Sequence, residues 1–283
     1  MLVQLAALVH THANLISRCG PVKDHECIAF LQWALPRLQL RWPGYRKVRR
    51  QVCKRIDRRI RALGLGSVKA YRARLETDPA EWAVLDGLTR ITISRFFRER
   101  DVFSYLCETA LPKLHALAAP EPVKIWSAGC AAGEEAYTVA IAARQQRIPV
   151  EIVATDSDEH QLGRARAARY SAGCLKELPV RWRMSAFEKE GDEFVLRDEL
   201  RDDVKLLRQD IRREMPDGPF HLVLCRYLAF TYFDAPLQHG IAERLLTRTM
   251  ANGFVALGKH ESWPTDVPGL VEARPGLRVY RKL

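Results

Sequence analysis

The residues best suited to chemistry lie in a short segment of small and acidic side chains. Residues 125–136 begin as an apolar strand, pass through a turn that contains Gly129 and Gly133, and enter a helix at Glu134. About 20 residues later, a second apolar run ends at Asp156, a spacing typical of a nucleotide-binding crevice in an α/β sheet. The glycines let the backbone approach a ligand, and the carboxylate accepts hydrogen bonds from ribose hydroxyls. The alternative is that Asp156 only caps the next helix.

The segments around this turn alternate between strand and helix patterns. We predict strands at residues 123–127, 150–154, 220–225 and 253–257, and helices at residues 134–145, 158–168 and 237–248. Such alternation predicts a mainly parallel sheet. Residues 271–281 read as a closing antiparallel hairpin that turns at Pro275-Gly276. Residues 171–208 break the alternation and are predicted to form a small β-insertion.

The chain before this region has a helical pattern. The apolar residues Val48, Val52, Ile56 and Ile60 recur every four positions and predict one buried stripe. Basic residues recur at steps of three and four and predict a separate basic stripe: Lys47, Arg50, Lys54, Arg58 and Arg61. This stripe is either a solvated face or a contact surface for an acidic partner. We expect a tail at residues 1–24, a helical domain at 25–115 and an α/β domain at 116–283, with the linker in residues 116–122.

Length and composition narrow the class of protein. A chain of 283 residues with 47% hydrophobic content is long enough for one large domain and a smaller one. No apolar run reaches the roughly 18 residues that would span a membrane, so no membrane insertion is expected. Residues 2–9 are apolar but short and are interpreted as a tail or helix start, not a signal peptide. The net charge of +11 favours an acidic partner: nucleic acid, an anionic membrane surface or an acidic protein.

The seven cysteines are scattered and include no Cys-x-x-Cys pair. They therefore indicate neither a disulfide framework nor a zinc cluster, and no metal site is predicted. A reducing cytoplasm fits this use of cysteine best.

Several motifs in order give the chain a resemblance to a known family. It resembles the CheR-type chemotaxis receptor methyltransferases, protein-glutamate O-methyltransferases that use S-adenosyl-L-methionine, over about residues 25–262. A parallel sheet closed by an antiparallel hairpin also favours a methyltransferase over a dehydrogenase. The motifs are Ser-Arg-Phe-Phe-Arg-Glu at 94–99, Trp-Ser-Ala-Gly-Cys-Ala-Ala-Gly-Glu-Glu-Ala-Tyr at 126–137, Ala-Thr-Asp-Ser-Asp at 154–158, Cys-Arg at 225–226 with Thr-Tyr-Phe-Asp at 231–234, and Leu-Gly-Lys-His-Glu at 257–261.

The resemblance implies a fold and a set of site residues. The fold is α/β: a Rossmann-like methyltransferase domain with an all-helical N-terminal domain and a small β-insertion. Arg98 and Tyr232 would lie beside the transferred methyl group, and S-adenosyl-L-homocysteine would be the product. The cofactor contacts implied are Thr92, Ser94 and Arg98; Gly129 and Gly133 in the turn; Glu134 at the amino-acid end; Asp156 at the ribose; Asp210 and Ile211 near the adenine; and Tyr227 and Leu228 after the third strand.

Simpler interpretations exist for two of these residues. Arg98 also suits a salt bridge with Glu99 or Glu135. Asp210 either accepts a hydrogen bond from the adenine amine or caps a turn before Ile211.

The chain departs from the family pattern after the third strand. It reads Cys225-Arg226-Tyr227, where the family commonly has Cys-Arg-Asn. A tyrosine at this position either stacks on a cofactor surface or fills part of the site and weakens binding.

The leading functional hypothesis is methyl-ester formation on glutamates of a chemoreceptor or related signalling protein in the cytoplasm. The expected partner is an acidic helical protein, such as a chemoreceptor cytoplasmic domain, that docks on the basic helix at residues 47–61. The alternatives are the same fold acting on a small molecule or another acceptor, and a cofactor-binding scaffold with a weakened site. Nucleic acid is not the expected acceptor, because the strand end at residues 225–228 lacks the Asn/Asp-Pro-Pro-aromatic motif used on exocyclic amino groups.

Overall fold

The computed structural model describes residues 22–283, which divide into two compact units between Ile91 and Thr92. This division precedes α7 (Arg100–Tyr105), the π-helical turn η3 (Leu106–Ala110) and α8 (Leu111–Ala118). The expected boundary between residues 115 and 116 is therefore not the one observed, because α8 packs on strands of the second unit. Residues 119–122 simply join α8 to the first strand. The interpretation of residues 2–9 lies outside the described residues.

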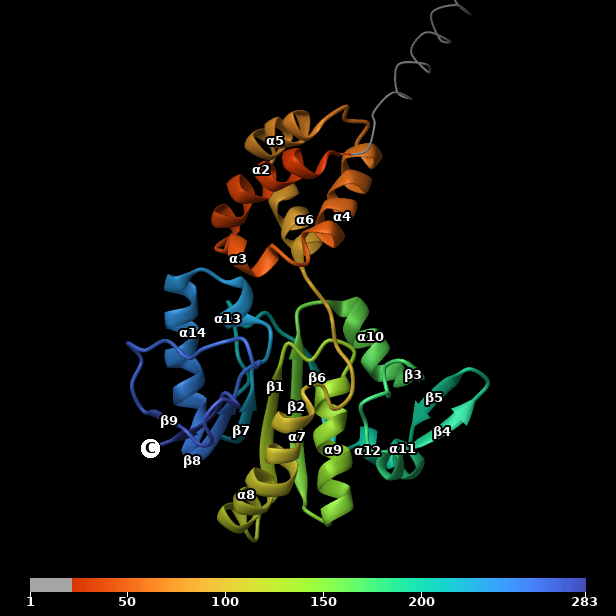
Figure 1. Cartoon of the computed structure of the whole chain (residues 1–283), viewed down its shortest axis with the longest axis vertical. Helices are drawn as coiled ribbons and strands as arrows, with labels where there is room; N and C mark the ends of the chain where they lie inside the picture. The colour runs from red at the N-terminus through yellow and green to blue at the C-terminus, as the bar shows by residue number, and fades with distance from the viewer. Residues whose placement is uncertain (1–21) are drawn as a thin grey trace, which may run out of the picture. The chain divides into compact units, whose positions relative to one another are not determined.

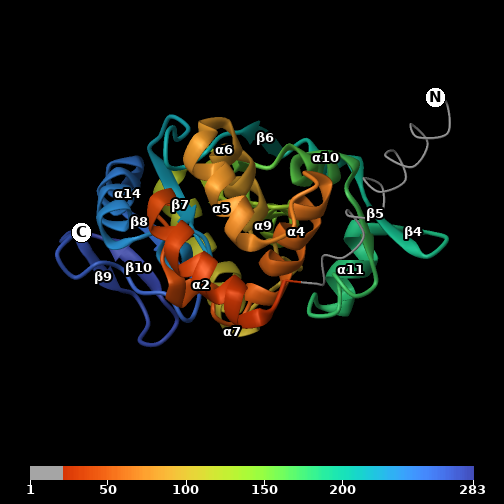
Figure 2. The same cartoon turned by 90° about the horizontal axis from the view of Figure 1, so that it is seen from above.

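The first unit is helical, as expected. Its helices are α2 (Asp24–Ala34), η2 (Leu35–Leu38), α3 (Trp42–Tyr45), α4 (Arg49–Ala62), α5 (Val68–Thr77) and α6 (Pro79–Thr89). Helix α4 packs on α2 and α6, and α5 packs on the same two helices (Figures 1 and 2). The predicted apolar stripe of α4 is confirmed at Val52, Ile56 and Ile60, which are all buried.

The basic side chains of α4 have two different environments. Arg59 turns inward and donates two hydrogen bonds to the buried carboxylate of Glu81, at 2.9 and 2.6 Å. Tyr71 donates a third, at 2.8 Å, and the Arg59 guanidinium holds the pKa of Glu81 below its usual range. The five basic residues singled out in the sequence are instead exposed: Lys47, Arg50, Lys54, Arg58 and Arg61.

The cysteine prediction was wrong for one pair. Cys27 on α2 and Cys53 on α4 form a disulfide with Cα atoms 6.0 Å apart. Helical packing brings together two residues separated by 26 positions in the sequence, and no local spacing signals such a contact. The bond fixes the basic helix to its neighbour, and it removes cysteine usage as an argument for a reducing compartment.

Reduction of this disulfide should destabilise the first unit. Closing a loop of this length lowers the entropy of the unfolded chain and contributes about 3 kcal/mol to the free energy of unfolding. Thiol counts in denaturant should rise by two when reductant is added, and urea unfolding should shift to lower concentration. The variant Cys53→Ser should reproduce that shift without reductant. Equal thiol counts with and without reductant would contradict the pairing.

The second unit is built on a seven-stranded sheet in the order β6-β2-β1-β7-β8-β10-β9. The first five strands are parallel, and β9 and β10 are antiparallel. The strands are β1 (Val123–Ala128), β2 (Val150–Asp156), β6 (Val204–Arg208), β7 (Phe220–Leu224), β8 (Thr249–Ala256), β9 (Leu270–Glu272) and β10 (Val279–Lys282), and the main helices are α9 (Glu134–Gln146), α10 (Glu159–Ala167) and α14 (Ala235–Arg248). The predicted strands, helices and closing hairpin are confirmed to within a few residues at their ends.

The β-insertion is smaller than predicted. A separate sheet in the order β3-β5-β4 consists of β3 (Arg169–Ser171), β4 (Phe187–Glu190) and β5 (Glu193–Leu196). Helices α11 (Val180–Ala186) and α12 (Asp198–Arg201) accompany it, and the β4–β5 hairpin extends away from the main sheet (Figure 1). Residues 204–208, expected within the insertion, form β6 of the main sheet because their backbone pairs with β2.

The strand order places a topological switch between β1 and β7. From β1 the chain continues to β2 and β6 on one side, and it returns through β7 and β8 on the other. Ligands of open α/β sheets bind outside the carboxyl ends of the strands at such a switch. The loops after β1 and β7 are therefore the natural place for a site. Within residues 22–283, no helix is both long and apolar enough to cross a membrane.

Candidate active site

The turn after β1 has the backbone conformation that its glycines allow. Gly129 and Gly133 have φ of 73° and 87°, in the left-handed region that favours glycine. A Cβ on Gly133 would lie 2.6 Å from the Tyr137 ring, and one on Gly129 would lie 2.8 Å from the Leu228 side chain. The positive φ angles, together with this packing against protein atoms, favour glycine at both positions. The contact between Gly129 and Leu228 also joins the β1 and β7 loops at the switch point.

Asp156, the last residue of β2, supports this turn. Its carboxylate accepts hydrogen bonds from the Ala131 N–H at 2.9 Å and from the Asp158 N–H at 2.9 Å. The helix-capping interpretation is wrong, because Asp158 is the residue whose carboxylate caps α10. Asp156 thus lies directly beside the small-residue turn, as the spacing predicted.

Glu134 begins α9 and is almost fully buried, with 3% of its surface exposed. Ser94 donates a hydrogen bond to its carboxylate, and burial raises the pKa of Glu134. Among the described residues, no hydrogen-bond partner reaches its Oε2 atom. A buried carboxylate oxygen without a hydrogen-bond donor costs free energy, so such an atom indicates a site for a donor from a ligand. A cationic or N–H group would fit here.

Arg98, from the segment before α7, lies near Tyr227 and Tyr232, which follow β7. The Arg98 guanidinium stacks on the Tyr227 ring, with Cζ 4.0 Å from the ring centroid. Tyr232 ends α13 (Ala229–Tyr232), and burial raises its pKa to about 12 while the nearby charge of Arg98 acts in the opposite direction. The cluster offers a planar cation beside a phenol that stays protonated at neutral pH. Such a pair of donors suits an acceptor carboxylate.

The residue that forms the expected salt bridges is Arg226, not Arg98. Arg226 is buried and pairs with Glu99 at 2.7 Å and with Glu135 at 2.9 Å. It also donates to the Arg98 carbonyl oxygen at 2.9 Å. A buried cation between two carboxylates fixes the segment before α7, the start of α9 and the loop after β7 in one arrangement.

One further carboxylate, that of Glu261, extends this support. Tyr227 donates its hydroxyl to Glu99 and its backbone N–H to the buried Glu261, the latter at 2.7 Å. Glu261 also accepts from the Gly258 N–H and from the Thr231 hydroxyl, at 2.7 and 2.6 Å. The sequence analysis missed the supporting roles of Arg226 and Glu261, which follow the ends of β7 and β8.

Asp210, Ile211 and Thr92 are three other residues implied by the resemblance. Asp210 follows β6 and pairs with Arg212 at 2.7 Å, and it accepts a hydrogen bond from the backbone N–H of the same arginine. This is the turn-capping arrangement that was the alternative for Asp210. Ile211 is buried beside it, and Thr92 lies half-buried at the start of the second unit.

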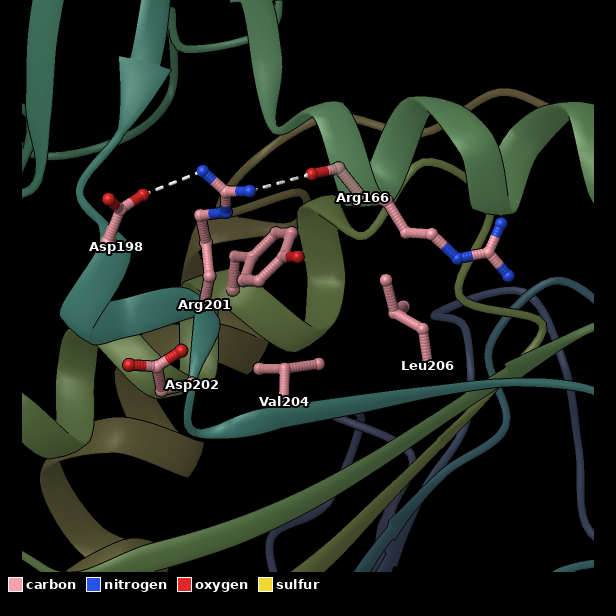
Figure 3. A pocket seen from close by; sticks show the side chains of 7 residues that line it. Arg166, Asp198, Arg201, Asp202, Val204 and Leu206 are labelled. Atoms are coloured by element: carbon pink, nitrogen blue, oxygen red, sulfur yellow. Dashed lines mark hydrogen bonds and ion pairs between the residues drawn. The ribbon is translucent and has the colours of Figure 1, made fainter.

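A surface pocket of about 680 Å³ lies elsewhere, beside α10, α12 and β6 (Figure 3). In its lining, Arg201 lies between the Asp198 carboxylate, at 2.7 Å, and the Arg166 carbonyl oxygen, at 3.2 Å, and the Arg166 side chain pairs with Glu159 at 2.6 Å. None of the predicted site residues lines it. In the part of the chain described, residues 22–283, no group of three or more acidic, histidine or cysteine side chains is arranged to bind a metal ion.

Comparison with known proteins identifies the family. Residues 92–275 match the model of the CheR methyltransferase SAM-binding domain, and residues 47–85 match that of the CheR methyltransferase all-alpha domain. The chain belongs to the CheR methyltransferase family. CheR membership identifies it as an S-adenosyl-L-methionine-dependent methyltransferase.

Relatives of the CheR chain support this assignment. Chemotaxis protein methyltransferase 2 of Pseudomonas aeruginosa is 30% identical over 75% of this chain and 78% of its own length. The chemotaxis protein methyltransferase of Klebsiella aerogenes is 30% identical over 76% of both chains. An uncharacterized 104.1 kDa protein of Rhodobacter capsulatus is 30% identical over 81% of this chain, which spans only 27% of that longer protein.

The residues at the carboxyl ends of β1 and β2 carry groups that complement those of S-adenosyl-L-methionine. The cofactor carries an α-ammonium group, which suits the unpartnered Oε2 of the buried Glu134. It also carries ribose hydroxyls, which suit the Asp156 carboxylate beside the glycine turn. Glu134 follows β1 and Asp156 ends the neighbouring strand β2, so both carboxylates lie beside the switch point, and their charge suits the ligand.

The substitution Glu134→Gln should lower the affinity for the cofactor and raise the stability of the fold. A raised pKa in the folded state means that the stability from protonated Glu134 is present below its unfolded pKa and is lost as the pH rises through the folded pKa. At neutral pH the buried charge is therefore a cost, and the glutamine variant should melt at a higher temperature. Its affinity for S-adenosyl-L-homocysteine should fall about tenfold or more, because a neutral amide replaces the carboxylate opposite the ammonium.

Calorimetry at several pH values checks this assignment of Glu134. In the wild type, affinity should fall as the pH drops through the raised pKa, and binding should release a proton. The glutamine variant should lose that pH dependence. A wild-type affinity that does not change with pH, or equal affinities of the two proteins, would refute the role of Glu134.

Proposed function

We propose that this chain forms methyl esters on glutamate side chains of a chemoreceptor or a related signalling protein. The observation that carries the proposal is the position of Arg98 in the same unit as Glu134 and Asp156: its guanidinium stacks on the Tyr227 ring, 4.0 Å from the centroid, and its charge acts on the protonated Tyr232. A cation and a phenol donor recognise an anionic acceptor, which distinguishes a carboxylate from a neutral alcohol or amine.

The chemistry requires alignment and not proton transfer. When bound, S-adenosyl-L-methionine supplies a sulfonium methyl group, which a carboxylate oxygen displaces in one step as the C–S electron pair leaves with the neutral thioether. A glutamate is ionised at neutral pH, so no general base is needed. Arg98 and Tyr232 would hold the acceptor in line and limit the access of water. They must hold it loosely, since strong binding of the ground-state anion would slow the attack.

The cofactor contacts that we propose follow the geometry of the site. Glu134 and Ser94 would bind the amino-acid end, and Asp156 the ribose. Leu228, against Gly129, would line the ligand at the switch point. For Asp210 and Ile211 we propose a position at the adenine edge, where Asp210 would accept from the exocyclic amine while it keeps its contacts to Arg212. Thr92 would reach the cofactor from the segment before α7.

Labelled methyl groups test the reaction. The chain is incubated with tritiated S-adenosyl-L-methionine and a purified chemoreceptor cytoplasmic fragment from the same organism. We expect label on the fragment that mild alkali releases as methanol, because esters are alkali-labile. Substitution of the labelled glutamates of the fragment by alanine should remove it. Alkali-stable label, or label confined to small molecules, would overturn the proposal in favour of another acceptor.

For the protein partner, we propose docking on the exposed basic face of α4. Arg50, Lys54, Arg58 and Arg61 lie on the face opposite its buried stripe, with Lys47 just before the helix, and an acidic helix is complementary to this charge. If the substrate is the cytoplasmic domain of a chemoreceptor, the protein acts in the cytoplasm. A disulfide is unusual there, so Cys27–Cys53 is a feature to test in cells and not a support for this localisation.

Charge reversal tests the docking surface. The double variant Arg50→Glu and Lys54→Glu should raise the KM for the protein substrate about tenfold or more, and the effect should shrink at high salt. The affinity for S-adenosyl-L-homocysteine should not change, because neither residue belongs to the second unit. The control is Lys69→Glu with Lys113→Glu, which changes net charge equally at exposed sites on other helices, α5 and α8. Equal KM values for the two double variants would remove α4 as the docking surface.

A further inference from the structure

We infer that Tyr227 is a positioning residue, which fixes the Arg98 guanidinium in the orientation that receives the acceptor carboxylate. The inference rests on the proposed function, since it gives Arg98 a role toward the acceptor. It assigns Tyr227 to the acceptor side of the site, where it acts through Arg98, and not to direct binding of the cofactor.

The Arg98 guanidinium is held by contacts on one face and at one edge. The guanidinium lies 4.0 Å above the Tyr227 ring, within the range of a cation–π interaction. One of its nitrogens donates to the Ile93 carbonyl oxygen. A planar cation held on one face by a ring and at one edge by a carbonyl has a defined plane. Its remaining N–H groups then point in fixed directions, which a flexible surface arginine would not provide.

Contacts on the far side of Tyr227 show that the ring itself is fixed. Its hydroxyl donates to Glu99, and its backbone N–H donates to Glu261 at 2.7 Å. Its edge lies against Gly258, where an added Cβ would be only 2.8 Å from the ring. Glu99 is in turn fixed by the ion pair with Arg226 at 2.7 Å. The ring is thus a rigid base for the guanidinium and not a side chain free to turn toward a ligand.

The backbone at Tyr227 adds a further constraint. Its φ is 55°, a conformation that costs energy in residues other than glycine and asparagine. Such strain persists only where the surroundings enforce it. Here it directs the ring under Arg98, while the next residue, Leu228, reaches the glycine turn. Tyr227 therefore contacts Arg98, whereas the adjacent Leu228 contacts the glycine turn.

The test compares Tyr227→Phe, which keeps the ring, with Tyr227→Leu, which removes it. In nitrogen-15 NMR spectra, the Nε–H signal of Arg98, identified by its loss in Arg98→Lys, should be displaced by the ring current of Tyr227. The displacement should persist in the phenylalanine variant and vanish in the leucine variant. This reading requires no acceptor protein, so it tests the stacked geometry even if the proposed function fails.

Kinetics with the chemoreceptor fragment then test the role. Removal of the ring should lower kcat/KM for the fragment about tenfold, and the phenylalanine variant should recover most of the loss. The affinity for S-adenosyl-L-homocysteine should change less than about twofold, since the ring does not bind the cofactor in this account. If Tyr227→Leu unfolds, Tyr227→Asn also lacks the ring and suits the positive φ.

The other outcomes would overturn the inference in distinguishable ways. If the affinity for S-adenosyl-L-homocysteine fell as much as kcat/KM does, Tyr227 would be a cofactor contact. Unchanged kinetics in a variant that has lost the ring-current displacement would make the stacking incidental to catalysis. A wild-type protein that shows the displacement but methylates no glutamate would instead contradict the proposed function, and with it the role of Arg98 toward a carboxylate.

Discussion

Asp156→Ala should abolish measurable binding of S-adenosyl-L-homocysteine, with affinity reduced about 100-fold or more. Two ribose hydroxyls would lose their charged acceptor, and the Ala131 N–H would lose the 2.9 Å hydrogen bond that supports the glycine turn. Titration calorimetry measures the loss directly. An unchanged dissociation constant would refute the ribose assignment.

Two neighbouring variants separate ligand binding from support of the turn. Asp156→Asn keeps one acceptor oxygen for Ala131 and should retain more affinity than the alanine variant. Asp158→Ala removes only the cap of α10, where the carboxylate accepts from the His160 N–H at 2.9 Å. It should lower stability by about 1 kcal/mol while it leaves the affinity nearly intact. Equal losses of affinity in Asp156→Ala and Asp158→Ala would point to general damage at the end of β2.

The second large effect concerns turnover. Arg98→Ala should keep the fold and lower kcat/KM for the protein acceptor about 100-fold or more, because the acceptor carboxylate loses the cation that aligns it. The fold should persist because Arg226, not Arg98, pairs with the carboxylates of Glu99 and Glu135. Thermal unfolding and turnover are measured on the same preparation.

Arg95→Ala is the matched control for this substitution. Arg95 is an exposed arginine three residues earlier, paired with Glu177 at 3.2 Å. Exposed pairs contribute little, so this variant should resemble the wild type in both measurements. Wild-type turnover in Arg98→Ala, or equal losses in the two variants, would remove Arg98 from the active site.

The parts of the fold that depend on local pattern were predictable. Val52, Ile56 and Ile60 recur at helical spacing, and they are the residues that α4 buries. The apolar runs before the glycine turn and before Asp156 are strands β1 and β2, because a buried parallel strand requires a continuous apolar segment. The spacing between the glycine turn and the end of the next strand was enough to predict that Asp156 lies beside the turn, where it accepts a hydrogen bond from Ala131.

The features that depend on contacts between distant segments were not predictable. Cys27 and Cys53 meet only because α2 packs on α4. Arg226 joins residues more than 90 positions away in the sequence, and nothing in its local sequence indicates which of two nearby arginines would be buried. Residues 204–208 carry a short β pattern that suits either an insertion or a sheet edge, and pairing with β2 decides between them.

The central claim is that the carboxyl edge of β1 and β2 binds S-adenosyl-L-methionine through Glu134 and Asp156. A crystal soaked with S-adenosyl-L-homocysteine tests it most directly. We predict the product's ammonium group at the Glu134 carboxylate and its ribose hydroxyls at Asp156, with Arg98 still stacked on Tyr227. A ligand bound elsewhere, or an edge without ligand and with the Tyr227 ring filling that space, would contradict the account.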